Sequence, residues 1–248
     1  MEITEQHIKK GYWYYRPTEN FPPPAKLLSE YEGEESLWLI TSHGNEPDNI
    51  IKKRERTYPR EIPELLSTVK TLWANHINQE TFDAITELQG IISLNINSNR
   101  IKDLSGLSNL VNLEHLGLLN MTKIESIEVL SRLTQLRTLK LENFKKISKF
   151  DVVSNLSKLE GLQIDGSMYT AQKIEDFDFL SDLTNLRYVT LTNTRTTNKN
   201  MDSFMGLLQL EMFQCSTNYP NCEFQKLADL PKLKHIGGNL YGLIKTKS

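Results

Sequence analysis

The sequence predicts an α/β solenoid in which about eight short repeats build a curved parallel β-sheet. Each repeat opens on an apolar residue and has further apolar residues at its fourth position and, except in the last unit, at its sixth, with mostly polar or small residues between them. A polar turn follows, and then an apolar residue at every third position. Successive side chains of a strand point to opposite faces, and a 3₁₀ helix has three residues per turn. Each unit is therefore expected to form one half-buried strand and a short 3₁₀ or extended segment on the convex side.

The repeats start at intervals of 22 to 27 residues. The first positions are Val69, Ile91, Leu113, Leu136, Leu159, Leu186, Leu210 and Leu233. A single unit has no partner for its apolar set, whereas stacked units share one continuous core. Burial contributes about 1.5–3 kcal/mol per large aliphatic side chain, which outweighs any surface interaction considered below.

The stretch 91–113 reads Ile91-x-x-Leu94-x-Ile96-x-x-Asn99-x-Ile101 before the phrase begins again. It resembles a leucine-rich repeat of the short subclass of about 22 residues, which includes phosphatase-regulator-like and bacterial internalin-like proteins. The resemblance implies a protein-binding module. The ninth-position asparagine of such repeats stands at Asn99 and Asn218, whereas Asn120, Asn143 and Asn193 come one place earlier. We therefore do not expect a continuous asparagine ladder at the ninth position.

The residues at the second position of each repeat support the predicted register independently. From the third unit onward these residues alternate in sign: Glu114, Arg137, Glu160, Arg187, Glu211 and Lys234. Parallel strands stacked in register place these side chains about 4.8 Å apart. We interpret the column as structural, since opposite charges there contribute about 0.2–1 kcal/mol per pair.

Residues 1–68 do not repeat and are expected to form an N-terminal cap, followed by the solenoid at 69–248. Stretch 37–40 has the spacing of a fourth and sixth position, so it predicts a degenerate strand beside the first repeat. Trp38 then shares the outward column of Trp73, unless it packs inside the cap. The basic run 52–56 is interpreted as a solvated loop. The glycine-rich last unit predicts an open C-terminal edge, and hence a monomer or a weak homodimer.

The charge, hydropathy and cysteine content of the chain narrow the class of protein to which it can belong. The 29 basic and 31 acidic residues give a net charge of −2, which does not favour nucleic acid or an anionic membrane. The first residues contain no apolar run of signal-peptide length, and no stretch is long enough to span a bilayer. The two cysteines, Cys215 and Cys222, suit a reduced compartment, with a disulfide between them as the less favoured alternative. The expected location is the cytoplasm.

No catalytic motif is recognisable, so the chain is predicted not to be an enzyme and to need no cofactor or metal. The five histidines are too scattered for a shared metal site. Lys140 and Glu142 alternate on one strand, and Asp165 lies one unit further along. Because an open sheet desolvates little, we expect these three to form a solvated ion cluster or part of a binding patch.

We therefore base the predicted function on the strand residues whose side chains point outward, away from the core. They present neutral polar ground with isolated large side chains, which is typical of a protein-binding face. The predicted partner-binding residues are Trp73, His115, Lys140, Glu142, Asp165, Tyr188, Met212 and Trp38. The long polar turns of the fifth to seventh units predict a second binding surface on the rim, unless their extra length is only drift in the length of the repeat. The expected partner is a folded protein that the chain inhibits, regulates or neutralises in an immunity-type role. The alternative is that residues 1–68 form a small catalytic or peptide-binding element to which the repeats deliver a substrate.

Overall fold

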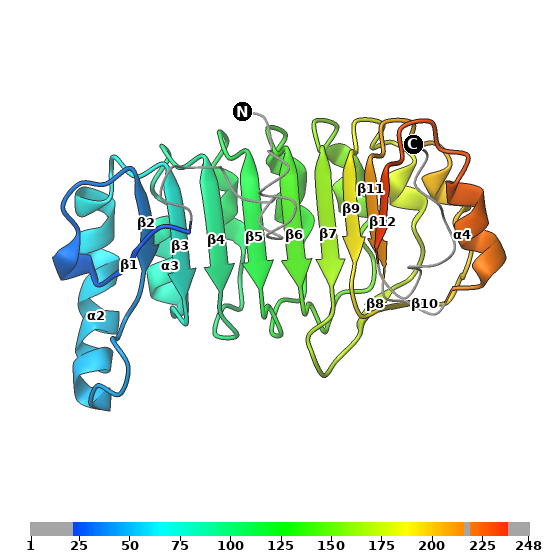
Figure 1. Ribbon diagram of the computed structural model, residues 1–248. Coiled ribbons are helices and arrows are strands. Elements are labelled where there is room, and N and C mark those ends of the chain that lie inside the picture. Colours follow the sequence, from blue (N-terminus) through cyan, green and yellow to red (C-terminus); the bar gives the residue numbers. More distant parts are fainter. Residues whose placement is uncertain (1–21, 216–218, 238–248) are drawn as a thin grey trace.

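The computed structural model describes residues 22–215 and 219–237. Within them, ten strands form one parallel sheet in the order β1-β2-β3-β4-β5-β6-β7-β9-β11-β12. One face of this sheet is outward, and the helical segments lie behind its opposite face (Figure 1). Its strands are β1 (Ala25–Lys26), β2 (Ser36–Leu39), β3 (Thr71–Asn75), β4 (Ser93–Asn97), β5 (His115–Leu119), β6 (Thr138–Glu142), β7 (Gly161–Asp165), β9 (Tyr188–Leu191), β11 (Met212–Cys215) and β12 (His235–Gly237). The predicted curved α/β solenoid is confirmed.

The predicted register is also confirmed. Leu94 of β4 pairs with Leu116 of β5, which pairs with Leu139 of β6, which in turn pairs with Leu162 of β7. All four side chains are fully buried and belong to one hydrophobic cluster that runs from the cap to the last units. Each unit shields the apolar side chains of its neighbour, as stacked repeats require.

The convex side is mostly 3₁₀ helix, as the period of three predicts. These segments are η2 (Ser105–Asn109), η3 (Glu128–Arg132), η4 (Asp151–Asn155), η5 (Asp178–Leu180) and η6 (Asp202–Phe204). The first and seventh units differ, because they carry the α-helices α3 (Gln79–Ile85) and α4 (Asn221–Leu227). Asn78 caps α3 by accepting a hydrogen bond from the Thr81 backbone N–H. This cap favours an α-helical first turn over the predicted 3₁₀ segment.

The fifth and sixth units contain a second sheet that the periodicity does not predict. Strands β8 (Gln172–Ile174) and β10 (Thr194–Thr196) pair in parallel immediately after the turns that follow β7 and β9. The Gln172 side chain is buried here. Its Oε1 accepts from the Phe144 N–H at 2.9 Å, and its Nε2 donates to the Ile147 carbonyl at 2.7 Å. Gln172 therefore joins the fifth unit to the fourth where no strand pairing does so.

The charge column has the predicted pairing. Arg137 Nε donates to Glu160 at 2.6 Å, and Arg187 Nε donates to Glu211 at 2.7 Å. Arg187 also reaches back to Glu160 at 3.4 Å, so the alternation continues across neighbouring units. These half-buried pairs lie at the amino ends of the strands and reinforce the register.

The cap consists of β1, the 3₁₀ segment η1 (Leu28–Glu30), β2 and helix α2 (Asp48–Leu65), which lies at one end of the sheet (Figure 1). Strand β2 pairs in parallel with β3 and places Trp38 opposite Trp73. The basic run 52–56 lies on α2, so its interpretation as a loop is wrong. The run consists largely of good helix formers, and Asp48 in the first turn complements the helix dipole. Residues 238–248 lie outside the described residues, and with them most of the glycine-rich unit on which the open-edge prediction depends.

Candidate functional site

Two tryptophans begin the outward column at the cap end of the sheet. Trp38 of β2, Trp73 of β3 and Asn95 of β4 are direct neighbours in register. The two indole rings lie 5.5 Å apart at an interplanar angle of 57°. Trp38 Nε1 and Asn95 Nδ2 are buried donors for which the described residues provide no hydrogen-bond partner. Because an unpaired buried donor is costly, these two groups are suited to meeting acceptor atoms of a bound molecule.

Most of the predicted site residues are much less accessible than an open concave face implies. Only 1% of the His115 surface and 3% of the Tyr188 surface are exposed. Trp73, Lys140, Asp165 and Met212 are also buried, whereas Trp38 and Glu142 are half-buried. The expectation that these side chains lie open to solvent is therefore wrong.

The bonding of these side chains accounts for part of their burial. His115 Nδ1 lies 2.8 Å from the Thr138 hydroxyl of the next strand. Each of four of these side chains has an interaction partner: Trp73, His115, Lys140 and Tyr188. At the spacing of parallel strands, side chains in one column also cover one another. The predicted residues thus form a densely packed layer instead of a loose polar surface.

Lys140, Glu142 and Asp165 come together as expected, but their environment differs from a solvated cluster. Lys140 Nζ lies 3.4 Å from Glu142, and Glu142 is the register neighbour of Asp165. Asp165 accepts from the Thr192 backbone N–H at 2.8 Å and from the Gln163 amide. Burial nevertheless dominates and raises the Asp165 pKa to about 6. The sheet therefore desolvates Asp165 much more than was expected of an open concave face.

This raised pKa predicts a pH-dependent stability. A carboxyl whose pKa is higher in the folded state contributes stability that is present below its unfolded pKa and lost as pH rises through about 6. We expect Asp165→Asn to stabilise the fold by roughly 1–3 kcal/mol near pH 7.5 and by almost nothing near pH 4. Urea unfolding of both proteins at several pH values measures the difference. A difference that stays constant over this range contradicts the assignment.

The turns after four of the strands share one backbone feature. His76, Asn120, Asn143 and Asn193 occupy the eighth position of their units, and all have positive φ values of 50–62°. Asparagine tolerates this left-handed conformation better than most residues. Asn120 Nδ2 donates to Asn97 at 2.7 Å, and Asn143 Nδ2 donates to Asn120 at 3.2 Å. A short asparagine ladder therefore exists, but it uses the seventh and eighth positions instead of the ninth.

The fifth unit replaces this asparagine with Gly166 and carries a longer turn, residues 166–171, here called the rim loop. Figure 1 shows the yellow-green loop after β7 extending beyond the carboxyl ends of the neighbouring strands. The Ser167 N–H donates to the Thr170 carbonyl at 2.8 Å, and Asn193 Nδ2 donates to the Ser167 carbonyl at 2.7 Å. The loop is thus held by its own backbone and by the next turn.

Two large apolar side chains lie at the tip of the rim loop. Met168 is 86% exposed and Tyr169 is 91% exposed, which makes them the most accessible large apolar residues of the described chain. Most other apolar residues of the repeats are buried. Sequence reasoning selected this turn for its length but missed these two residues. Adjacent methionine and tyrosine in a polar turn were the available signal.

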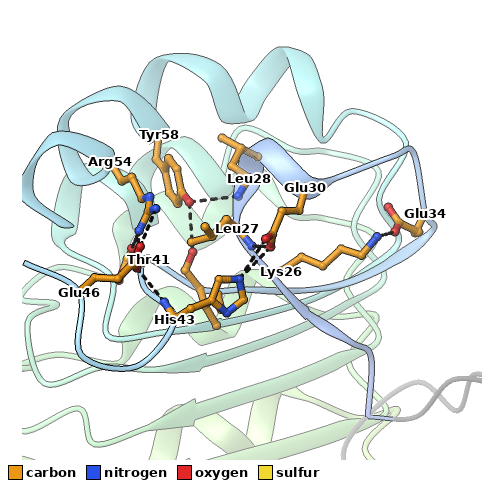
Figure 2. A network of polar contacts seen from close by, with 11 residues as sticks. Lys26, Leu27, Leu28, Glu30, Glu34, Thr41, His43, Glu46, Arg54 and Tyr58 are labelled. Carbon is orange, nitrogen blue, oxygen red and sulfur yellow. Dashed lines mark hydrogen bonds and ion pairs between the residues drawn. The ribbon is translucent and has the colours of Figure 1, made fainter. Parts of the chain in front are cut away.

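The cap is held by an internal polar network (Figure 2). Tyr58 accepts from the Leu28 N–H at 3.0 Å and donates to the Ile40 carbonyl at 3.2 Å. Arg54 binds Glu46 through both terminal nitrogens, at 2.6 and 3.0 Å, and lowers the Glu46 pKa to about 2. These contacts join α2 to η1 and to the segment that follows β2. They provide a structural role for the described part of the cap and no specific observation in favour of a catalytic element.

The described residues contain neither a metal-binding cluster nor a membrane-spanning helix. No group of three or more His, Cys, Asp and Glu side chains is placed to hold a metal ion. No helix in the same part of the chain is both long and apolar enough to cross a bilayer. Cys215 is buried and Cys222 is exposed.

Comparison with known proteins agrees with this architecture. Residues 89–132 match the family model for leucine-rich repeats in two copies. No curated protein matches the chain. Residues 89–132 thus carry leucine-rich repeats, and the chain has the fold of leucine-rich repeat proteins of the internalin kind.

Several solved structures share the fold. An internalin (inlF) of Listeria monocytogenes is similar over 82% of this chain and 60% of its own, with 18% identity and a TM-score of 0.56. Internalin C2 of the same species is similar over 73% of this chain and 80% of its own, with 22% identity and a TM-score of 0.55. A Leptospira interrogans leucine-rich repeat protein covers 85% of this chain at 18% identity and a TM-score of 0.55. The chain spans 60% of the first of these structures and 51% of the last.

Proposed function

We propose that this chain is a non-enzymatic protein-binding module that acts inside the cell. It holds a folded protein with the outward side of its sheet and with the rim after the strands. The exposed Met168–Tyr169 pair on the clamped rim loop carries the proposal. Large side chains presented on a rigid support lose little conformational freedom on binding, so they are effective anchors. Leucine-rich repeats commonly serve as scaffolds of this kind.

The tryptophan pair supplies the second anchor. Trp38 and Trp73 lie at the cap end of the same sheet, beside the Asn95 donor, which is unpaired among the described residues. A bound protein that places a carbonyl oxygen there removes the cost of leaving such donors unpaired. The partner then also contacts the residues between the two anchors, which are His115, Lys140, Glu142, Asp165, Tyr188 and Met212. Lys140 and Glu142 set the orientation of the bound partner. We expect the partner to be a protein that binding inhibits, regulates or neutralises.

Alanine substitutions test this role. We expect Tyr169→Ala and Trp73→Ala each to weaken partner binding by about 2 kcal/mol, since buried aromatic anchors dominate interface energies. Affinity purification from the native cell identifies the partner, and calorimetry with the purified pair measures the affinities. Val111→Ala is the matched control, because Val111 is 56% exposed in the turn before β5. This turn lies at the amino ends of the strands, whereas the rim loop lies at their carboxyl ends. Equal affinities for all three variants contradict both anchors.

A further inference from the structure

Exposed cations surround the rim loop. Lys145 follows β6, Lys173 lies on β8 and Arg195 lies on β10, and all three are exposed. None of them forms an ion pair with another residue of the described chain. The three cations, together with Met168 and Tyr169, are here called the basic rim patch.

Hydrogen bonds between consecutive turns hold this patch together. The Asn143 N–H donates to the Asp165 carbonyl at 2.9 Å, and the Phe144 N–H donates to Gln172 Oε1 at 2.9 Å. These bonds join the turn that carries Lys145 to the residues immediately before and after the rim loop. On the other side, the Gln172 N–H donates to the Asn193 carbonyl at 2.9 Å, which joins the rim loop to the turn before Arg195. The cations therefore flank the exposed apolar tip at positions set by the backbone.

Two of the cations are direct lateral neighbours. Lys173 pairs in register with Arg195 across the β8–β10 ladder, where parallel strands are about 4.8 Å apart. Like charges at this spacing are unfavourable for the isolated fold. The nearby acids do not compensate, because Glu142 lies 3.4 Å from Lys140 and Glu175 lies 3.6 Å from Lys149. The patch is thus locally cationic, although the chain as a whole carries a net charge of −2.

We infer that the basic rim patch binds an acidic surface surrounding an apolar pocket on a folded protein. The inference rests on the proposed function and adds the chemical class of the partner. Met168 and Tyr169 enter the pocket, while Lys145, Lys173 and Arg195 face the carboxylates around it. Such charge complementarity selects the partner and accelerates its encounter. Single-stranded nucleic acid is the less suitable occupant, because it needs successive aromatic platforms and Tyr169 is the one exposed aromatic ring of the patch.

The test uses defined probes. Two display libraries of constrained peptides share the same apolar positions, and the remaining positions carry Asp and Glu in one library and Lys and Arg in the other. Peptides from both libraries are selected for binding to the full chain. Those that no longer bind the Tyr169→Ala variant are then kept as Tyr169-dependent binders. We expect binders from the acidic library, with affinities about tenfold lower for Lys173→Glu and lower still when Arg195→Glu is added. Lys158→Glu is the control, since Lys158 is exposed in a turn before a strand, at the opposite side of the sheet from the rim loop, and its side chain bonds Gln135.

Folding artefacts are separable from lost binding. Lys173→Glu places a carboxylate beside Arg195, so its melting temperature is expected to stay unchanged or to rise while probe binding falls. Tyr169-dependent binders that ignore the charge reversals overturn the acidic class and leave the protein-binding role intact. An absence of Tyr169-dependent binders in both libraries contradicts both proposals. Binding of a single-stranded RNA oligonucleotide that is lost in Lys173→Glu overturns the inference in favour of nucleic acid.

Discussion

Replacing Gly166 with alanine is expected to lower the free energy of unfolding by about 2–4 kcal/mol. A Cβ at this position lies 2.4 Å from the Asn193 carbonyl oxygen, 2.5 Å from the Thr170 carbonyl oxygen and 2.8 Å from the Gln172 nitrogen. All three are backbone atoms, so no side-chain rotation relieves the contacts. Either the rim loop moves away from the following turn, or the two turns separate together.

Gly206→Ala is the matched control for this substitution. Its added Cβ meets no heavy atom within 4 Å, so a change within about 0.5 kcal/mol is expected. Urea unfolding gives the two free energies. Hydrogen exchange over residues 161–175 reports whether the rim loop is displaced, because the Ser167 and Thr170 amides are hydrogen-bonded in the native loop. Equal stabilities of the two variants contradict the close packing at Gly166.

Replacing Gln172 with leucine is expected to cost about 2–5 kcal/mol, although leucine preserves much of the volume. The substitution leaves the Phe144 N–H and the Ile147 carbonyl without their partner in a buried environment. Each unsatisfied buried group costs about 1–3 kcal/mol. A loss of this size lowers the melting temperature of a chain of this length by about 4–20 °C, given 2–4 °C per kcal/mol.

Gln89→Leu provides the comparison, because Gln89 is exposed and no side-chain hydrogen bond is known for it in the described chain. A near-zero effect there and a large one at residue 172 separate the lost hydrogen bonds from any general consequence of an added leucine. A Gln172→Leu variant as stable as the wild type shows that the fifth unit does not depend on this link.

Much of the fold was predictable because the core follows a period. Leu94, Leu116, Leu139 and Leu162 align as the spacing predicts, since stacking leaves one arrangement that buries them all. The alternating charges likewise follow directly from the register. The cap strand was accessible from the spacing of Leu37 and Leu39 alone.

Other features depend on contacts that a periodic pattern does not encode. The eighth-position asparagines adopt positive φ because of the turn geometry, and Gly166 replaces asparagine where the backbone of the next turn comes too close for a Cβ. The raised pKa of Asp165 results from its burial between elements of different units. Gln172 looks like an ordinary polar residue of a long turn until its three hydrogen bonds are known.

The candidate site was predicted in kind but not in exposure. Outward positions were assumed to be open, whereas His115 and Tyr188 are buried among their bonding partners. The exposed apolar residues instead lie on the rim loop, where the chain lengthens the fifth unit. A repeat pattern identifies such a turn as irregular, but it does not show which of its side chains are left in solvent.

Photo-crosslinking in the native cell tests the central claim most directly. A photoreactive phenylalanine analogue is placed at Tyr169 in one variant and at Val111 in another, since both positions hold exposed apolar side chains on opposite edges of the sheet. We predict a discrete crosslinked protein from position 169 that is absent from position 111 and lost when Lys173→Glu and Arg195→Glu are added. Identical crosslinks from both positions, or none from position 169, contradict a binding surface on the rim.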